Sequence, residues 1–349
     1  MASDNPNRIV TIGASAGGIE SLRAVVAGIP GDCRAAIFVV LHVPPYDPSA
    51  LPEIIGRSGP LPVSHAEDGE RIRARRIYVA PPDHHMLLSA RTISVTKGPK
   101  ENRFRPSIDA LFRSAAYSFG AKVVGVVLSG ALDDGTSGLW SIKRLGGISV
   151  VQDPKDARFE SMPLSAMEQV KIDYKLKASA IGPLIGKLSS KKAAIHKTND
   201  PTLRKRLSAE MKIAAEAGAF QKGIMDWGEL TPFTCPECHG ALVKLKEGNM
   251  TRYRCHTGHA YSDSSLLEDV MEHTGEMLWQ VMRSMEEAVM LLRHLGEHME
   301  ERGFEKRASV FLSKARDIER RTRAVREAAL ANESLSTENM LAAKRKTRL

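Results

Sequence analysis

The stretch that decides the fold is 11–22, "TIGASAGGIESL". It continues an apolar run that begins at Ile9 and passes through a glycine-rich turn into an amphipathic segment, the pattern of a strand, a tight turn and a helix. Such a turn early in an α/β fold either cradles a phosphate group or presents a side chain, here Ser15, as a nucleophile. The rest of the sequence distinguishes these two uses.

The phosphate-binding interpretation finds little support in the motif itself. The segment "GASAGG" (13–18) lacks the spacing of the G-x-G-x-x-G dinucleotide motif and the lysine of the G-x-x-x-x-G-K-S/T motif. A dinucleotide-binding fold also places an acid near the end of its second strand to hold a ribose. The second apolar run, "VVLHVPP" (39–45), carries His42 there. A nucleotide-binding protein is therefore only a rival interpretation, which predicts measurable binding of NAD or ATP.

Residues 8–185 alternate short β-branched runs with helical patterns. Strands that are apolar throughout, joined by amphipathic crossovers, predict an α/β fold with a doubly wound, mostly parallel, Rossmann-like sheet. The segments 76–81 and 92–97, with "DHHMLL" (83–88) between them, could form a local antiparallel excursion. The predicted strands are 8–13, 35–42, 76–81, 92–97, 122–130 and 147–153, and the predicted helices are 17–29, 107–120 and 135–146.

Three kinds of reactive side chain follow the apolar runs. Ser15 follows the first run, His42 closes the second, and Asp133 and Asp134 follow "KVVGVVLSG" (122–130). Reactive groups gather outside the carboxyl ends of parallel strands, so these side chains are expected to converge. Taken singly, they would be a helix cap, a structural hydrogen-bonding histidine and a turn. Together they are the residue types of a Ser-His-Asp triad, in which a base activates a weak hydroxyl nucleophile.

Six blocks of the sequence, in order, resemble the catalytic domain of the chemotaxis protein-glutamate methylesterases, the CheB family. They are "IGASAGG" (12–18), "VVLHVPP" (39–45), "IYVAPPDHHM" (77–86), "RPSIDALFRSAA" (105–116), "VVLSGALDDGTSGL" (126–139) and "VQDPKDARFESMPLSA" (151–166). The resemblance implies a serine esterase with Ser15 as nucleophile, His42 as general base and Asp134 as orienting carboxylate, with Asp133 as a minor rival. It implies hydrolysis of glutamyl methyl esters on methylated chemoreceptor-like proteins, deamidation of certain glutamines, and no cofactor for catalysis.

The sequence departs from the family pattern at a few positions. Ala131 and Leu132 stand where the family often has methionine and a second glycine, and Ala16 follows the serine where the family often has threonine. The chain begins at the esterase-like block, so we expect it to lack the phosphorylated receiver domain that usually precedes it. A non-catalytic signalling adaptor, which binds partners through the C-terminal half of the chain, is the rival interpretation.

Length and charge suggest several modules. The chain has 349 residues and a formal net charge of +9. Much of the excess lies in 187–206 and in the terminal "AAKRKTRL" (342–349), which are interpreted as solvated linker and tail. No nucleic-acid-binding module accompanies this charge, so no specific nucleic-acid binding is expected. With no secretory signal or membrane-length apolar run, the protein is expected to be cytoplasmic.

A second motif lies in the C-terminal half. Cys235 and Cys238 form a C-x2-C knuckle, and Cys255 and His259 form a C-x3-H knuckle, a pattern typical of a structural Zn²⁺ site in a zinc ribbon. His259 is the better fourth ligand than His256, which is adjacent to Cys255. Cys33 is predicted to be a buried thiol.

The remaining sequence completes the predicted organisation. Apolar positions recur at three- and four-residue steps on both sides of the turn at Arg302 and Gly303, which predicts an antiparallel helical hairpin. The recurring positions are Val281, Met285, Ala288, Leu292, Leu295 and Met299 before the turn, and Phe304, Ala308, Phe311, Ala315, Ile318, Thr322, Val325 and Ala329 after it. This hairpin could pack within the chain or form a homodimer. The predicted modules are 1–185 (esterase), 186–230 (basic helical linker), 231–263 (Cys/His module), 264–331 (hairpin) and 332–349 (disordered basic tail).

Overall fold

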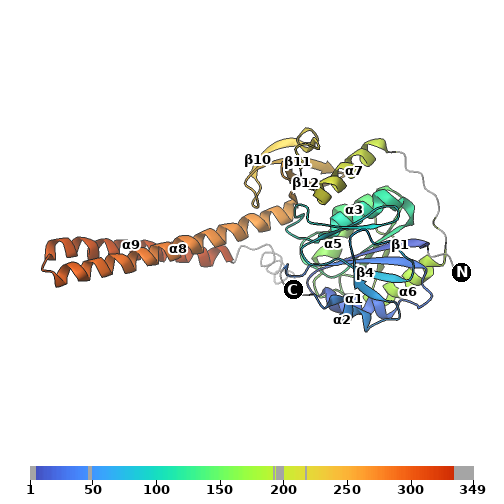
Figure 1. Ribbon diagram of the computed structural model, residues 1–349, viewed down its shortest axis with the longest axis horizontal. Helices are drawn as coiled ribbons and strands as arrows, with labels where there is room; N and C mark the ends of the chain where they lie inside the picture. The colour runs from blue at the N-terminus through green and yellow to red at the C-terminus, as the bar shows by residue number, and fades with distance from the viewer. Residues whose placement is uncertain (1–4, 46–48, 192, 194–199, 217, 334–349) are drawn as a thin grey trace. The chain divides into compact units, whose positions relative to one another are not determined.

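The computed structural model describes residues 5–45, 49–191, 193, 200–216 and 218–333 (Figure 1). It divides into two compact units, 1–266 and 267–349. Within the described ranges, no helix is both long enough and apolar enough to cross a bilayer. The predicted basic tail lies, apart from its first two residues, outside these ranges.

A seven-stranded sheet forms the centre of the first unit in the described ranges. Its order is β3-β4-β2-β1-β7-β8-β9, and each pairing described within it is parallel. The predicted doubly wound sheet is confirmed. The strands are β1 (Arg8–Ala14), β2 (Ala35–Leu41), β3 (Val63–His65), β4 (Arg76–Val79), β7 (Val123–Val127), β8 (Ile148–Gln152) and β9 (Tyr174–Leu176).

Helices cover both faces of this sheet (Figure 1). On one face lie α1 (Gly18–Ala27), α2 (Leu51–Gly56) and α6 (Ala178–Ser189). On the other lie α3 (Ile108–Phe119), α4 (Thr136–Arg144) and α5 (Ser161–Gln169), with a 3-10 turn at Gly120–Lys122. Successive strand residues point to opposite faces, so Phe38 packs into one apolar core and Val39 into the other.

The strand order reverses at β1. Its neighbours are β2 on one side and β7 on the other, and the chain leaves for α1 directly after β1. In an open α/β sheet, the crevice outside the carboxyl ends of the strands at such a switch point is the usual place for a ligand. The fold therefore brings the ends of β1, β2 and β7 to one crevice.

The predicted antiparallel excursion is partly wrong. The segment 76–81 contributes β4 to the parallel sheet, whereas β5 (His85–Leu88) pairs antiparallel with β6 (Ile93–Thr96). The sequence analysis predicted an antiparallel pair in this region and placed β6 in it correctly. It assigned the partner strand to 76–81, whereas the partner is β5.

The predicted solvated linker is also partly wrong. Helix α7 (Pro201–Glu216) begins with the predicted cap, since the Asp200 carboxylate accepts the N–H of Leu203 at 2.9 Å. Leu203 and Leu207 nevertheless pack into the apolar core to which α3 contributes, and Glu210 is fully buried. Arg204, Lys205 and Lys212 of this helix are exposed, whereas Arg206 pairs with Glu210 and with Glu247 of β11 (Ala241–Glu247).

A four-stranded antiparallel sheet follows, which we call the Cys/His ribbon (229–262). Its order is β10-β11-β12-β13, and a 3-10 turn at Ile224–Asp226 precedes it. The strands are β10 (Glu229–Thr234), β11 (Ala241–Glu247), β12 (Met250–Cys255) and β13 (Ala260–Ser262).

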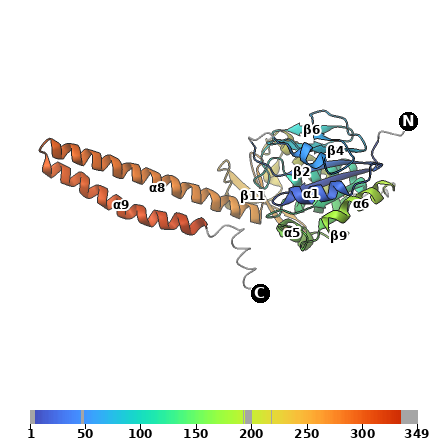
Figure 2. The ribbon, with the colours of Figure 1, turned by 90° about the horizontal axis from the view of Figure 1, so that it is seen from below.

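The predicted helical hairpin is confirmed. Helix α8 (Asp263–Glu301) and helix α9 (Glu305–Glu333) lie side by side with the turn at 302–304 (Figure 2). The predicted α9 positions Ala308 and Ala315 are buried. In the middle of α8, Met282 and Val289 are buried. Of the predicted positions there, Met285, Ala288 and Leu292 are half-buried, and Val281 is 49% exposed. Dimerisation through this hairpin stays a prediction.

Candidate active site

Ser15 lies on a sharp turn between β1 and α1. Gly17 has φ 66°, a left-handed conformation that glycine adopts without a Cβ penalty. The Ser15 N–H donates to Ser129 O at 3.0 Å, and the Ser129 hydroxyl donates to Ala16 O at 2.8 Å. A Cβ at Gly130 would lie 3.0 Å from the Ser15 Cβ, so a small residue is needed beside the serine. Ser15 remains partly exposed at the top of the sheet.

His42 stands at the end of β2 within reach of the serine. Its Nδ1 lies 3.1 Å from Ser15 Oγ, and its Nε2 lies 2.9 Å from Asp134 Oδ2. The His42 side chain is 4% exposed and that of Asp134 is 2% exposed. With the Nε2 proton donated to the carboxylate, Nδ1 is free to accept from the serine hydroxyl. The three side chains that the sequence predicted as a triad thus form one chain of hydrogen bonds.

Asp134 follows β7 and lies against the start of α3. Its Oδ1 accepts from Asn102 Nδ2, Ser107 Oγ and the N–H groups of Asp109 and Gly135, at 2.9–3.2 Å. Its Oδ2 accepts the Ile108 N–H at 2.8 Å besides His42. Burial alone would raise the pKa of Asp134, but the bonds from His42, Asn102 and Ile108 hold that pKa below its ordinary value. The carboxylate is therefore charged and fixed in orientation.

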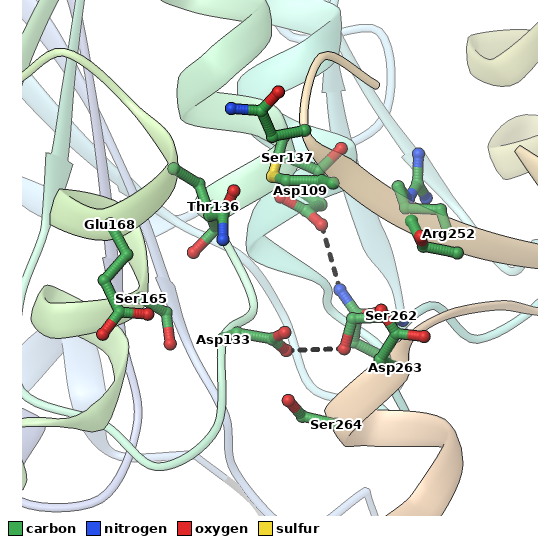
Figure 3. A pocket seen from close by; sticks show the side chains of 15 residues that line it. Asp109, Asp133, Thr136, Ser137, Ser165, Glu168, Arg252, Ser262, Asp263 and Ser264 are labelled. Atoms are coloured by element: carbon green, nitrogen blue, oxygen red, sulfur yellow. Dashed lines mark hydrogen bonds between the residues drawn. The ribbon is translucent and has the colours of Figure 1, made fainter. Parts of the chain in front are cut away.

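The rival carboxylate, Asp133, points elsewhere. Its Oδ1 accepts from Ser262 Oγ at 2.7 Å (Figure 3). Burial and the neighbouring charge of Asp134 raise the pKa of Asp133 to about 6. The geometry therefore brings Asp134, and not Asp133, to the histidine.

Another buried acid, Asp109, lies behind Asp134. Its carboxylate accepts the Gly138 N–H at 2.6 Å and the Asn102 amide at 3.0 Å. Burial and the charge of Asp134 raise the pKa of Asp109 to about 7.

Sequence reasoning missed several residues that shape this site. Phe104 stacks on the His42 ring, with centroids 3.6 Å apart and an interplanar angle of 8°. Asn102 and Ser107 bind Asp134, and Ser129 holds the Ser15 turn. Ser107 and Ser129 lie in blocks that carried the family resemblance, so that resemblance was the available signal for them. Asn102 had no such signal.

The Cys/His ribbon brings together the predicted metal ligands. The ligand atoms of Cys235, Cys238, Cys255 and His259 all lie within 4.8 Å of one another. Cys238 Sγ and Cys255 Sγ are 3.6 Å apart, and His259 Nδ1 is 3.6 Å from the sulfurs of Cys235 and Cys255. The cysteines are free thiols, and Cys33 is buried far from them in sequence, as predicted. The exposed ring of His256 packs against Gly240, outside the set of four.

Hydrogen bonds to sulfur support this arrangement. The Gly258 N–H donates to Cys255 Sγ at 3.3 Å, and the Thr257 hydroxyl donates to Cys238 Sγ at 3.4 Å. The hydrogen bonds from Cys235, His259 and the Gly258 N–H hold the pKa of the Cys255 thiol below its ordinary value, and the contact with Cys255 raises the pKa of Cys235. Donors directed at sulfur favour thiolates, which are the form that binds a metal.

Comparison with known proteins identifies the part of the chain that carries the triad. The family model described as CheB methylesterase matches residues 10–185. A protein of Pyrococcus horikoshii named protein-glutamate methylesterase/protein-glutamine glutaminase is 37% identical over 174 residues, which cover 48% of this chain and 47% of that protein. A protein of Leptospira interrogans, provisionally named for the same two activities, is 37% identical over 180 residues, or 51% of this chain and 93% of that protein.

A solved structure agrees. The crystal structure of the Thermotoga maritima CheB methylesterase catalytic domain matches with a TM-score of 0.51 and 34% sequence identity. The match covers 52% of this chain and 98% of that domain. The similarity therefore accounts for the α/β body and leaves the Cys/His ribbon and the helical hairpin outside it.

Proposed function

Because the chain belongs to the CheB methylesterase family, we propose that it hydrolyses γ-glutamyl methyl esters on proteins, with Ser15 as nucleophile, His42 as general base and Asp134 as orienting carboxylate. The observation that carries this proposal is the order of hydrogen bonds from Ser15 Oγ through His42 to Asp134. A rival role as a non-catalytic adaptor is not favoured, since an adaptor has no need of this order. The match to the methylesterase family also counts against the nucleotide-binding rival.

The first half of the reaction forms an acyl-enzyme. His42 Nδ1 takes the hydroxyl proton as Ser15 Oγ attacks the ester carbonyl, and a tetrahedral intermediate forms. The charge of Asp134 stabilises the imidazolium through Nε2. The imidazolium then gives its proton to the methoxy oxygen, the carbon–oxygen bond breaks, and methanol leaves.

The second half restores the enzyme. Water gives a proton to His42 and attacks the acyl carbon, and collapse of the second tetrahedral intermediate returns the proton to Ser15 Oγ and releases the glutamate carboxylate. With a glutamine side chain the same steps release ammonia in place of methanol. This second reaction corresponds to the glutaminase activity in the names of the relatives.

The start of α1 is the proposed oxyanion site. The Ser15 N–H is not available for it, because it donates to Ser129 O. The next N–H group, that of Ala16, is the expected donor, and α1 has no side-chain cap at Gly17 that would compete with a negative charge. A helix N-terminus stabilises a developing oxyanion through its N–H groups and its dipole.

For the Cys/His ribbon we propose a structural Zn²⁺ held by Cys235, Cys238, Cys255 and His259. Tetrahedral coordination with Zn–S bonds of about 2.3 Å and Zn–N bonds of about 2.0 Å requires ligand atoms about 3.5–3.8 Å apart. The separations of 3.6 Å fit this requirement. A complete set of four protein ligands is typical of a structural site, and the ion would hold the two knuckles together.

The proposed substrates are methylated chemoreceptor-like signalling helices. The test is to incubate the full chain with a peptide from such a helix that carries a glutamyl methyl ester, and to follow its mass. We expect each ester to become a carboxylate with release of one methanol, and we expect the Ser15→Ala variant to leave the peptide unchanged. An intact ester after incubation with folded wild-type protein would refute the proposal.

A further inference from the structure

The Cys/His ribbon is joined to the α/β body next to the proposed catalytic carboxylate. We define the Asn102 loop as residues 98–106, which lie between β6 and α3. The Asn102 N–H donates to Ala260 O of β13 at 2.7 Å, and the Ala260 N–H donates to Lys100 O at 3.2 Å. The ribbon therefore holds the backbone of the Asn102 loop.

The Asn102 side chain connects the two parts. It is 3% exposed, and its Nδ2 donates to Asp134 Oδ1 at 2.9 Å and to Asp109 Oδ2 at 3.0 Å. On the other side, its Oδ1 accepts from the Ser262 N–H at 3.1 Å and from Ser265 Oγ at 3.2 Å. Both polar ends of the amide are used, so its orientation is fixed from the ribbon side as well as from the carboxylate side.

A second bond from the ribbon reaches the same carboxylate loop. Ser262 Oγ donates to Asp133 Oδ1, the residue before Asp134, at one wall of a cavity of about 180 Å³ (Figure 3). Ser262 Oγ and Ser265 Oγ are themselves 3.0 Å apart. Ser262 and Ser265 thus contact the groups on either side of Asp134 without contacting the triad.

The Asn102 loop also carries a direct contact to the histidine. Asn102 has φ 50°, a left-handed conformation that asparagine tolerates better than most residues. Two residues later, Phe104 stacks on His42, and the loop is closed by paired backbone bonds between Glu101 and Phe104. A shift of this loop would move both the donor on Asp134 and the ring beside His42.

Buried charges fix the position of the ribbon against this loop. Arg252 and Arg254 of β12 bind Glu101 of the Asn102 loop and Glu210 of α7, at 2.9–3.3 Å. These four residues are at most 2% exposed. A buried charge left without its partner is strongly unfavourable, so the cluster permits essentially one register of ribbon on body.

We propose that Asn102 is a positioning residue through which the Cys/His ribbon and the first turn of α8, which directly follows it, control the geometry of Asp134. Ser262 of β13 and Ser265 of α8 are the side chains through which they act. This proposal rests on the triad assignment above. It gives the ribbon a role in turnover: correct placement of β13 is required for full catalytic rate, while substrate binding does not depend on it.

The test compares full-length variants for ester hydrolysis and for labelling by a fluorophosphonate, which measures the reactivity of Ser15 without the natural substrate. The double variant Ser262→Ala/Ser265→Ala removes the hydroxyl of β13 that binds Asp133 and the hydroxyl of α8 that binds Asn102, and it leaves Asn102 and the triad unchanged. Ser264→Ala is the matched control, because within the described residues the Ser264 side chain makes no hydrogen bond. Thermal unfolding and bound-zinc content show whether each variant is folded.

We expect the double variant to lose roughly tenfold in kcat and in labelling rate, with KM and zinc content unchanged and Ser264→Ala like wild type. Ser262→Thr, which keeps a hydroxyl, should restore most of the loss attributable to Ser262→Ala. A folded double variant with wild-type kcat would overturn the inference while leaving the proposed function intact. If the double variant unfolds, Ser262→Ala alone decides, and wild-type labelling by that variant overturns the inference. A wild-type protein that neither hydrolyses esters nor reacts with the probe would overturn both.

Discussion

Replacement of Asp134 by asparagine tests the chemical role of the carboxylate with little change in shape. Oδ1 of Asp134 accepts four hydrogen bonds, whereas Oδ2 accepts two, from His42 Nε2 and the Ile108 N–H. In Asp134→Asn the amide oxygen therefore takes the place of Oδ1, and the NH2 group faces His42. The NH2 group then donates to Nε2, the ring proton moves to Nδ1, and Nδ1 can no longer accept from Ser15.

The expected loss is large and specific to turnover. An imidazole held in the wrong tautomer costs about 10^4-fold in kcat in serine hydrolases of this design, and we expect about 10^3- to 10^4-fold here with little change in KM. The Ile108 N–H loses its acceptor, so the free energy of unfolding should fall by about 1–3 kcal/mol. Methanol release gives kcat, and urea unfolding shows that the variant is folded under the assay conditions.

The matched control is Asp133→Asn at the adjacent position. The amide introduced by this substitution would still accept from Ser262 through its carbonyl oxygen, and it has no bond to His42, so activity should stay within a few-fold of wild type. If Asp133→Asn loses activity and Asp134→Asn keeps it, the assignment of the orienting carboxylate is wrong. Equal losses of activity in two folded variants would also contradict the reasoning.

Three further predictions concern stability and the metal site. Glu210→Gln leaves the buried arginines around it short of one negative charge, so urea unfolding should show a loss of about 3–5 kcal/mol in the free energy of unfolding. Glu216→Gln, on the exposed face of the same helix, is the control and should change that free energy by no more than about 0.5 kcal/mol. Similar losses for the two variants would contradict the buried cluster. His259→Ala should abolish stoichiometric zinc binding, measured by metal analysis after dialysis, and His256→Ala should retain it; the reverse result would exchange the two ligands. Burial raises the pKa of Asp133 from 3.8 to about 6, so ionisation of this group lowers the stability of the folded protein as the pH rises through that interval. Asp133→Asn should therefore have a higher Tm than wild type above pH 6 and the same Tm as wild type near pH 4. Parallel pH profiles of Tm for the two proteins would show that the pKa is not raised.

The sequence predicted the parts of the site that strand ends determine. Ser15, His42 and Asp134 each follow an apolar run, and parallel strands bring such positions together without detailed knowledge of packing. The short edge strands β3 and β9 were missed because three residues carry too little periodicity to distinguish a strand from a loop.

What the sequence did not predict depends on contacts between distant segments. Ser262 and Asn102 are 160 positions apart, and nothing local to either residue indicates the bond between them. The sequence analysis interpreted the charged helix α7 as solvated because the partners of Glu210 are not local. They are arginines of β12 that lie more than forty positions later in the chain. On α8 the apolar residues are so numerous that their spacing alone does not show which of them face α9. In the structure Met282 is buried, whereas Val281 is exposed.

The central claim is that Ser15 is a nucleophile activated by His42, and covalent labelling tests it most directly. The folded full-length chain is treated with a fluorophosphonate, and the adduct is located by peptide mass mapping. We predict a single adduct on Ser15, absent in Ser15→Ala and formed at least a hundredfold more slowly in His42→Ala, in line with the about 10^2- to 10^4-fold contribution of a general base. An adduct that persists in Ser15→Ala, or labelling that is unaffected by His42→Ala, would contradict the claim.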